Sequence, residues 1–385
     1  MVSGEKSPAR HYFDWAATAV PVPSPSGTDA SFGNPSSPHQ EGRLARESLE
    51  EARSRCAAVL GVNPQTIYFT SGGTESNAIV LYSHLLNKSG GRLLASAVEH
   101  ASVRENISIL EGLGKPAALI PVDSSGRVSP ALLGKALEKH ADTRFAAIMA
   151  VNNEIGTVMD MAALSRVLRG RGGAPIHIHC DIVQAAGKVP VDISGWDLDS
   201  ASLSAHKLGG PRGIGLLYLR RPLKSIYAGG GQEKGIRPGT ENTAGALALA
   251  ACLESHASPE PLQSEYAAAS RRWEKLIRAL QSLERCSLIP RDRPARGEVF
   301  SPYILQASFD GIPGEVMVRA LDDLGFAVST GSACSSASPE RPVLQALGIQ
   351  SKQSLEGIRI SQGWSTTDEE IELLLQALRE VLLFL

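Results

Sequence analysis

Apolar residues follow two patterns along the chain: they recur every three to four positions in some segments, as in helices, and form short runs in others, as in strands. From about Gly42 the apolar residues recur every three to four positions, which predicts an amphipathic helix ending at Gly61, with Pro64 close behind. A short run of strand-forming residues follows at 66–70 (TIYFT), and the residues SGGTES then open another helix. The apolar positions of the first helix are Leu44, Leu49, Ala52, Cys56, Val59 and Leu60.

Further strand-like runs follow, separated by segments long enough to cross over a sheet. They read RLLAS, RFAAIMAV, PIHIHC, ASLS and, after Pro211, GIGLLYL. Strands that alternate with helices favour an α/β fold with a mainly parallel sheet covered by helices on both faces.

The pattern changes near Thr240. Helical stretches are predicted near 241–256 and 262–283, and strands such as YILQASF and EGIRIS then mix with helices near 313–324, 340–347 and 367–384. We therefore expect a large domain over residues 12–261 and a smaller α+β domain over 262–385, which residues 1–11 join. The Pro- and Ser-rich stretch 21–38 is predicted to be a loop.

Composition excludes several classes of protein. The chain has 385 residues, 43% of them hydrophobic, and 38 basic against 40 acidic residues give a net charge of −2. Because no long basic stretch interrupts this balance, we expect no nucleic-acid partner. The N-terminus lacks the apolar core of a signal peptide, and no run approaches the roughly 18 apolar residues of a membrane span, so no membrane association is expected.

The cysteines indicate a reducing compartment. There are five, an odd number, and none forms a C-x-x-C pair. This pattern argues against a disulfide framework and against a zinc site, so no metal is expected and the cytoplasm is the predicted location.

The residues SGGTES, at 71–76, lie where a strand ends and a helix begins. Gly73 allows close approach of a ligand to the backbone, Thr74 adds a hydroxyl, and the start of a helix attracts an anion. The same residues would also serve as a plain turn and helix cap. The spacing is not that of a nucleotide-triphosphate loop.

Two polar residues follow other strand-like runs. His100 comes after Val98 and Glu99, and Asn153 follows the apolar run 145–151. Ligands of open α/β sheets gather at the carboxyl ends of the strands, which favours a binding role. A lone histidine in this position would more often be structural.

A stronger signal is Asp181-x-x-Gln184 followed by Ser204-Ala-His206-Lys207. An aspartate there could simply cap a helix, and a lysine near glycines is usually solvated. Together, however, they suit pyridoxal 5′-phosphate, which needs a lysine for its Schiff base and a carboxylate against its ring nitrogen.

At this point the sequence resembles fold-type I pyridoxal-phosphate enzymes of the class V aminotransferase group, and within it cysteine desulfurases and selenocysteine lyases. The resemblance implies a seven-stranded, mainly parallel sheet flanked by helices. It rests on ten blocks in order over nearly the whole chain: YFDWAAT, FGNPSSPH, FTSGGTESN, VEHAS, VNNEIGTV, DIVQAAGKV, SAHKLGGPRGIG, GGGQEKGIRPGTEN, STGSACSS and IRISQGW.

The resemblance also implies a role for each candidate residue. The expected roles are cofactor attachment at Lys207, a partner for the ring nitrogen at Asp181, bonds to the ring oxygen from Gln184 and Asn153, a stacked catalytic ring at His100, phosphate contacts from Gly73, Thr74, Ser204 and His206, and binding of the substrate carboxylate by Arg359 with Asn153. Thr240, in RPGTEN, would reach the phosphate of the neighbouring subunit of a homodimer.

Cys334 distinguishes the subfamilies. It lies in STGSACSSASPE, a stretch of small residues that cannot build a core and should be mobile and exposed. That setting suits a thiol that approaches the substrate and leaves with its sulfur. The stretch resembles the desulfurase branch with a long cysteine loop. The other four cysteines are interpreted as core residues.

The implied reaction converts L-cysteine to L-alanine and leaves a persulfide on Cys334. A sulfur-acceptor protein would then serve iron–sulfur cluster assembly or thiolation of tRNA or a cofactor. Alternatives are a selenocysteine lyase acting on L-selenocysteine, another class V aminotransferase, or a catalytically silent scaffold. A dehydrogenase is disfavoured because no G-x-G-x-x-G follows the early strands. The block DWAATAVP and the short segment after it, residues 16–33, depart from the family pattern.

Overall fold

A computed structural model describes residues 9–22, 32–86, 90–331 and 341–385. Cys334, and part of the loop expected at 21–38, lie outside these residues. Of the helices in the described ranges, none combines the length and the apolar content of a bilayer-spanning segment.

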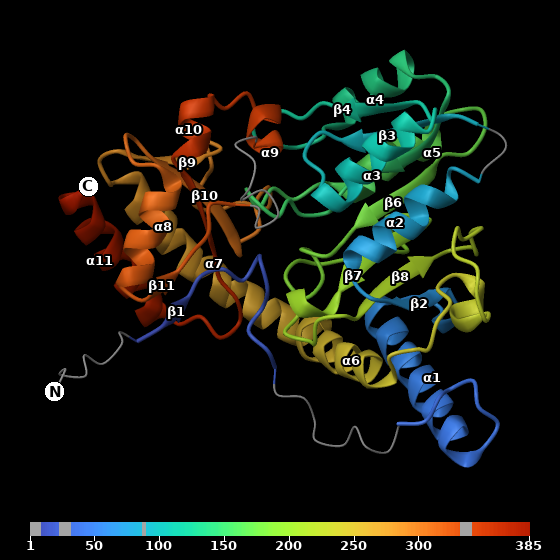
Figure 1. Ribbon diagram of the computed structural model, residues 1–385. Helices are drawn as coiled ribbons and strands as arrows, with labels where there is room; N and C mark the ends of the chain where they lie inside the picture. Colours follow the sequence, from blue (N-terminus) through green and yellow to red (C-terminus); the bar gives the residue numbers. More distant parts are fainter. Residues whose placement is uncertain (1–8, 23–31, 87–89, 332–340) are drawn as a thin grey trace.

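A seven-stranded sheet forms the larger part of the molecule (Figure 1). Its strand order is β2-β8-β7-β6-β5-β3-β4, and β8 alone runs opposite to the others. The expected α/β fold with a mainly parallel sheet is therefore confirmed. The strands are β2 (Ile67–Thr70), β3 (Arg92–Ser96), β4 (Ala117–Ile120), β5 (Thr143–Ala147), β6 (His177–Asp181), β7 (Ser200–Ser204) and β8 (Gly215–Leu219).

Helices cover both faces of this sheet. Along β3, Leu93 packs into a cluster with α2 and α3, whereas Leu94 packs into a second cluster with the remaining helices. Because both faces are covered, the strands read as continuous apolar runs rather than as alternating ones. The helices are α1 (Gln40–Leu60), α2 (Gly73–Ser83), α3 (Ala101–Gly112), α4 (Pro130–Lys139), α5 (Met161–Gly170) and α6 (Thr243–Ala257).

A three-stranded antiparallel sheet, β12-β10-β9, lies beside the larger one and has its own apolar cluster. Phe13, which follows the short strand β1 (His11–Tyr12), is buried in that cluster, and β1 pairs in parallel with β11. The N-terminal segment thus packs with the C-terminal part of the chain. The remaining elements are α7 (Pro259–Gln281), β9 (Cys286–Ile289), β10 (Ile304–Phe309), α8 (Gly314–Asp323), β11 (Phe326–Ala327), α9 (Pro342–Ala346), α10 (Ser351–Leu355), β12 (Gly357–Ser361) and α11 (Asp368–Phe384).

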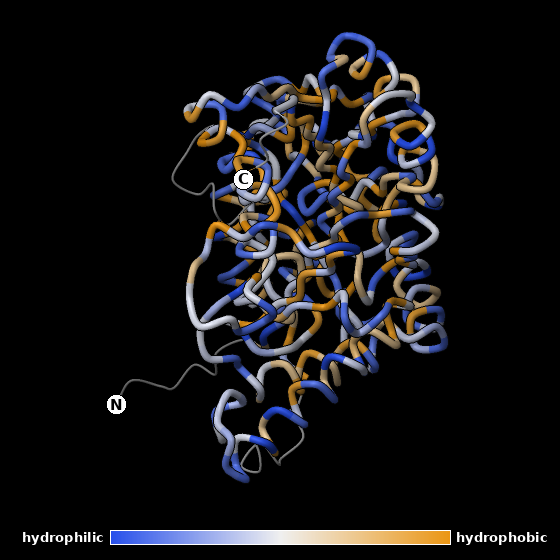
Figure 2. The backbone as a smooth tube through the Cα atoms, turned by 90° about the vertical axis from the view of Figure 1, so that its right-hand side faces the viewer, coloured by the Kyte–Doolittle hydropathy of each residue, from blue (hydrophilic) through white to orange (hydrophobic). Residues whose placement is uncertain are grey.

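Hydropathy follows this arrangement. In Figure 2 many hydrophobic segments run through the middle of the molecule, and hydrophilic segments mark much of its outer rim. The first helix, α1, ends as expected at Gly61, whose φ of 65° lies in the left-handed region that favours glycine. The described residues also include three short 3-10 helices: η2 (Pro64–Thr66), η3 (Ala205–Lys207) and η4 (Gln232–Gly235).

Candidate functional site

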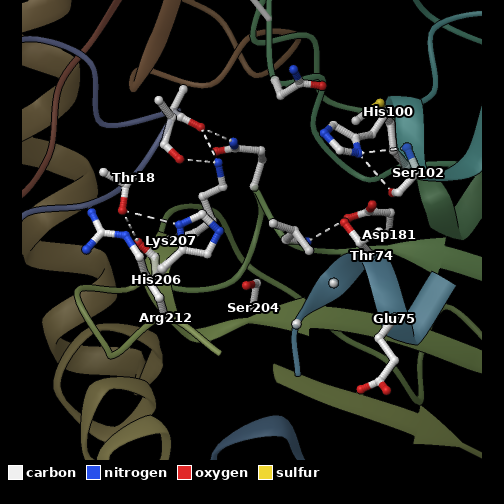
Figure 3. Close-up of a pocket in the computed structure, with 18 of the residues that line it drawn as sticks. Thr18, Thr74, Glu75, His100, Ser102, Asp181, Ser204, His206, Lys207 and Arg212 are labelled. Carbon is white, nitrogen blue, oxygen red and sulfur yellow. Dashed lines mark hydrogen bonds between the residues drawn. The ribbon is translucent and has the colours of Figure 1, made fainter. Parts of the chain in front are cut away.

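A cavity of about 500 Å³ lies at the carboxyl ends of the central strands (Figure 3). Its walls come from the start of α2, from the residues after β6 and β7, from residues 16–18 and from β12. Ten of the predicted site residues line it: Gly73, Thr74, His100, Asn153, Asp181, Gln184, Ser204, His206, Lys207 and Arg359. Thr240 is exposed and does not line the cavity, and Cys334 lies outside the described residues.

One end of the cavity is suited to an anion. Helix α2 begins at Gly73, and its cap, Gly72, has no side chain to occupy the N–H groups of the first turn. A Cβ on Gly73 would lie 2.6 Å from Cγ2 of Val183, so a larger residue would require the Val183 side chain to move. Ser204, the last residue of β7, faces the same end.

Lys207 lies in η3, directly after β7. Its Nζ donates hydrogen bonds to the carbonyl oxygens of Ala16 and Ala17, each at 2.6 Å. The neighbouring His206 contacts the hydroxyl of Thr18 through Nδ1 at 3.2 Å. Burial, together with the charge of Lys207, lowers the pKa of His206 to about 4, so its ring is neutral. Residues 16–18 of the N-terminal segment therefore contact both Lys207 and His206.

Asp181 is the last residue of β6 and is buried. Its carboxylate accepts hydrogen bonds from Nδ2 of Asn77 at 2.8 Å and from the backbone N–H of Val183 at 2.9 Å. Both oxygens of the carboxylate are thereby held in place. The side chain can therefore present a negative charge to a cationic ring nitrogen.

Gln184 lies one turn beyond Asp181 and spans the floor of the cavity. Its Nε2 donates to the carbonyl of Ala16 at 2.8 Å, and its Oε1 accepts from Nζ of Lys188 at 2.9 Å. Lys188 is fully buried, which lowers its pKa to about 7. The amide is thus fixed at both ends.

His100 caps helix α3. Its Nδ1 accepts a hydrogen bond from the backbone N–H of Ser102 at 3.1 Å. Burial, the largest cause, lowers the pKa of His100. The adjacent Glu99 is buried beneath it, and burial raises the pKa of that carboxyl to about 8.

Arg359 reaches the cavity from β12 of the smaller sheet. Its guanidinium donates to the carbonyl of Asn153 at 2.9 Å and pairs with Asp14 at 2.8 Å. Within the described part of the chain, two buried polar atoms here have no hydrogen-bond partner: Nε of Arg359 and Oδ1 of Asn153. They are an unsatisfied donor and an unsatisfied acceptor on two residues that line the cavity.

The sequence matches the family described as Aminotransferase class-V over residues 11–374. This chain belongs to that family. It is 39% identical to the NifS/IcsS protein homolog of Lactobacillus delbrueckii subsp. bulgaricus, with 96% of each chain covered. It is 38% identical to the cysteine desulfurase IscS of Vibrio cholerae, over 91% of this chain and 85% of that relative.

Solved structures of class-V relatives agree with the fold. A structure titled NIFS-LIKE PROTEIN superposes with a TM-score of 0.89 at 33% identity, covering 98% of this chain and 100% of that one. A structure of SspA in complex with cysteine gives a TM-score of 0.76 at 29% identity, covering 91% and 98%. The expected family and its fold-type I architecture are therefore confirmed.

Several residues of this class-V site had no predicted role. They include the main chain of Ala16 and Ala17, and the side chains of Thr18, Asn77, Ser102 and Arg212. All six lie inside the sequence blocks that carry the family resemblance. The blocks therefore located these residues, but the sequence did not show which of them turn toward the cavity.

Proposed function

We propose that this protein is a pyridoxal-phosphate-dependent cysteine desulfurase, which converts L-cysteine to L-alanine and passes the sulfur to Cys334 as a persulfide. The observation that carries the proposal is the convergence of a lysine, a buried carboxylate and a glycine-lined helix start on one cavity. The cysteine desulfurases among the relatives support the same reaction.

The residues present fit the cofactor. Gly73, Thr74, Ser204 and His206 would hold its phosphate, because a helix start and hydroxyl groups suit an anion and any larger side chain at position 73 would clash with Val183. Lys207 would attach it, and Asp181 would face its ring nitrogen. The partnerless Oδ1 of Asn153 would accept a hydrogen bond from substrate or cofactor. When bound, the cofactor draws electrons away from the α-carbon of the substrate.

Arg359 would bind the substrate carboxylate. A guanidinium binds a carboxylate through two parallel hydrogen bonds. Asp14 already occupies one of its nitrogens, Nη2, whereas Nε has no partner among the described residues. A substrate carboxylate can therefore share the guanidinium through Nε or replace Asp14.

The chain's own residues would manage the protons. Lys207 would take a proton from the α-carbon, because its Nζ lies within the cavity, and His100 would exchange protons with the sulfur groups. The Cys334 thiolate would then attack the substrate sulfur. The carbon–sulfur bond breaks, a sulfur–sulfur bond forms, and the carbon product takes up a proton to become L-alanine. No oxidant is needed.

Three further features belong to the same proposal. We propose a homodimer, a cytoplasmic location and a sulfur-acceptor protein that serves iron–sulfur clusters or thiolation. The IscS and NifS names of the relatives support the acceptor. The reducing location is supported by the four described cysteines, Cys56, Cys180, Cys252 and Cys286, all of which are free thiols.

The test is to supply the purified protein with L-cysteine and, in parallel, with L-selenocysteine, with and without a reductant, and to measure alanine and sulfide or selenide. We expect alanine and sulfide from L-cysteine. Lys207→Ala should lose both activity and the visible absorption band of the bound cofactor. Lys188→Met is the matched control, since this buried lysine does not line the cavity and should keep the band. A wild-type protein that binds no pyridoxal phosphate would overturn the proposal.

A further inference from the structure

Asn77 lies on α2, is completely buried, and has four hydrogen bonds to side chains. On one side, its Nδ2 donates to Oδ2 of Asp181 and to Oγ of Ser102, both at 2.8 Å. On the other side, its Oδ1 accepts from the hydroxyl of Ser202 at 2.5 Å and contacts Nε2 of His179 at 2.9 Å. The amide therefore uses both of its N–H groups and both lone pairs of its oxygen.

The charge of Asp181 fixes the direction of these bonds. An ionised carboxylate can only accept, so the nitrogen of Asn77 must face Asp181 and its oxygen must face His179. His179 must then donate from Nε2, which leaves Nδ1 to accept from the hydroxyl of Ser200 at 2.8 Å. Burial lowers the pKa of His179 to about 3, in agreement with a neutral ring that carries one proton.

The second N–H of Asn77, which donates to Ser102, also sets the direction of the hydrogen bond between Ser102 and His100. Because the oxygen of Ser102 accepts from Asn77, its own hydrogen is available to Nδ1 of His100, which lies 2.8 Å away. The backbone N–H of Ser102 also points at the same Nδ1, at 3.1 Å. Figure 3 shows the two contacts from Ser102 to the His100 ring. Since Nδ1 accepts twice, the proton of the neutral ring must lie on Nε2.

We propose that Asn77 is a positioning residue that joins Asp181 to His100 through Ser102 and, together with the backbone N–H of Ser102, holds the His100 ring with its proton on Nε2. In the proposed function, on which this inference rests, His100 is then set to donate a proton from Nε2 and to take one back there. The same amide also fixes the position of Oδ2 of Asp181 by donating to it. One buried side chain thus links the group that faces the ring nitrogen to the group that handles protons.

Loss of the amide should raise the pKa of His100. Besides burial, three charged groups act on the pKa of this ring. Asp181 favours the protonated form, whereas Lys207 and Arg104 oppose it. Without Asn77, the negative charge of Asp181 is less neutralised, and the Ser102 hydroxyl is free to accept a proton bound to Nδ1. Both changes stabilise the doubly protonated ring. We expect a shift of about one pH unit, the size of one hydrogen bond.

The tautomer is measurable without cofactor. Protein labelled with ¹⁵N in its histidines is studied free of cofactor by NMR spectroscopy over a pH series, and His100→Gln assigns the His100 signals. The expected wild-type ring at pH 7.5 is neutral, with hydrogen on Nε2 alone. Asn77→Leu should raise the pKa of His100, whereas the neutral ring keeps its proton on Nε2 because the backbone N–H of Ser102 still donates to Nδ1. Asn77→Val, which also removes both donors and adds no charge, gives the same test if the leucine variant does not fold.

Ser202→Ala is the matched control. It removes a partner of the same amide, on the oxygen side, and leaves both donors of Asn77 in place, so His100 should behave as in wild type. Hydrogen on Nδ1 in the wild type, unchanged titration in both Asn77 variants, or an equal shift in Ser202→Ala would overturn the inference. Alanine production is assayed separately. A protein that makes no alanine but carries the proton of His100 on Nε2 would defeat the proposed function and leave this chain of bonds standing.

Discussion

Burial changes the ionisation of several single residues around the cavity. The imidazole of His206 and the amine of Lys188 are pushed toward their neutral forms, because removing a charged group from water costs more than its local partners return. Glu99 is affected in the opposite sense, since burial favours the protonated carboxyl. Burial around the site therefore disfavours the charged forms of these three side chains.

Burial of Glu99 should make the free energy of unfolding fall as the pH rises. Its pKa is about 8 when folded against an ordinary 4.5, so between these values the folded protein holds a proton that the unfolded chain has released. Its contribution is complete below about pH 4.5 and is lost as the pH rises toward 8. Each unit corresponds to about 1.4 kcal/mol, so wild type should lose about 4 kcal/mol more unfolding free energy than Glu99→Gln between pH 5 and 8.5. Chemical denaturation of the cofactor-free proteins measures this difference.

The exposed Glu47, on α1, supplies the control for this experiment. Glu47→Gln should follow the wild-type pH dependence, because this exposed substitution leaves Glu99 and its surroundings unchanged. Parallel curves for Glu99→Gln and wild type would show that Glu99 stays ionised when buried.

The cysteines should differ sharply in their effect on sulfur transfer. Cys334→Ser should keep the cofactor and still bind L-cysteine, yet release at least about 100-fold less sulfide, because the proposed nucleophile is missing. Cys180→Ser is the control: Cys180 is completely buried, and burial raises its pKa well above the ordinary value, so no thiolate forms there. The serine at 180 should cost about 1–3 kcal/mol of stability but retain activity. Equal losses of sulfide in the two variants would reassign the nucleophile.

Sequence periodicity predicted the helices and strands whose apolar pattern is regular. Helix α1 has an apolar stripe, and β2, β6 and β8 are apolar runs bounded by glycine, proline or polar residues. Strand β4 was not predicted, because it is a partly exposed edge strand whose residues, AALI, suit a helix equally well. The two-residue strands β1 and β11 were also missed. They form only because residues more than 300 positions apart are brought together, which no local pattern records.

The site was predictable to the extent that strand ends converge. Asp181, Lys207 and Gly73 each follow a strand or begin a helix, and parallel strands bring such positions to one edge of the sheet. Asn77 was not predicted, because it lies in the interior of a helix and only the three-dimensional contact with Asp181 reveals it. The pairing of Arg359 with Asp14 could not be foreseen either, since it depends on the path of the N-terminal segment.

Helix α1 anchors the glycine-rich loop 228–242 through a buried ion pair. Arg53 binds both carboxylate oxygens of Glu233, at 2.7 and 2.8 Å, and both side chains are almost completely buried. Glu233 has a φ of 45°, a left-handed conformation that costs energy in a residue other than glycine. The backbone N–H of Phe69 donates to the same carboxylate at 2.8 Å. The pair therefore holds the loop in a backbone conformation that its own sequence disfavours.

Arg53→Met should destabilise the protein by about 3–5 kcal/mol, because it leaves the Glu233 carboxylate buried without its partner. Arg55→Met is the control on the same helix. Its pair with Glu254 is partly exposed and should contribute at most about 1 kcal/mol. Urea denaturation of the three proteins compares these costs. A loss no larger in Arg53→Met than in Arg55→Met would mean that the buried pair does not anchor the loop.

The cavity is formed jointly by the two sheets and the N-terminal segment, which are distant from one another in the sequence. The seven-stranded sheet supplies Asp181 and Lys207, the smaller sheet supplies Arg359, and the N-terminal segment supplies Asp14 and the carbonyls that bind the lysine. A shift of the smaller sheet relative to the larger one would move Arg359 away from the lysine. The packing between the two sheets is therefore part of the binding site.

The glycine-rich loop 228–242 presents Thr240 at the surface, where a second subunit can contact it. The segment GGGQEKGIRPGTEN is anchored at Glu233, and Arg237 pairs with Glu75 at 3.4 Å, yet Thr240 itself is exposed and does not line the cavity of its own chain. An exposed hydroxyl in an anchored loop is suited to contact another chain. We expect Thr240 to complete the phosphate site of the partner subunit in a homodimer, and Thr240→Ala to weaken cofactor retention by about 1.5–3 kcal/mol, the loss of one hydrogen bond to a charged group.

Complementation between two variants tests this arrangement. Lys207→Ala and Thr240→Ala are co-expressed with different affinity tags, and the mixed dimer is isolated after the Thr240 variant alone has been shown to retain cofactor poorly. If Thr240 acts across the interface, one site of the mixed dimer lacks both groups and the other is intact. About half of the wild-type activity per dimer should then return, together with one cofactor per dimer. If Thr240 acts within its own chain, every site carries one lesion, and activity stays at the level of the separate variants.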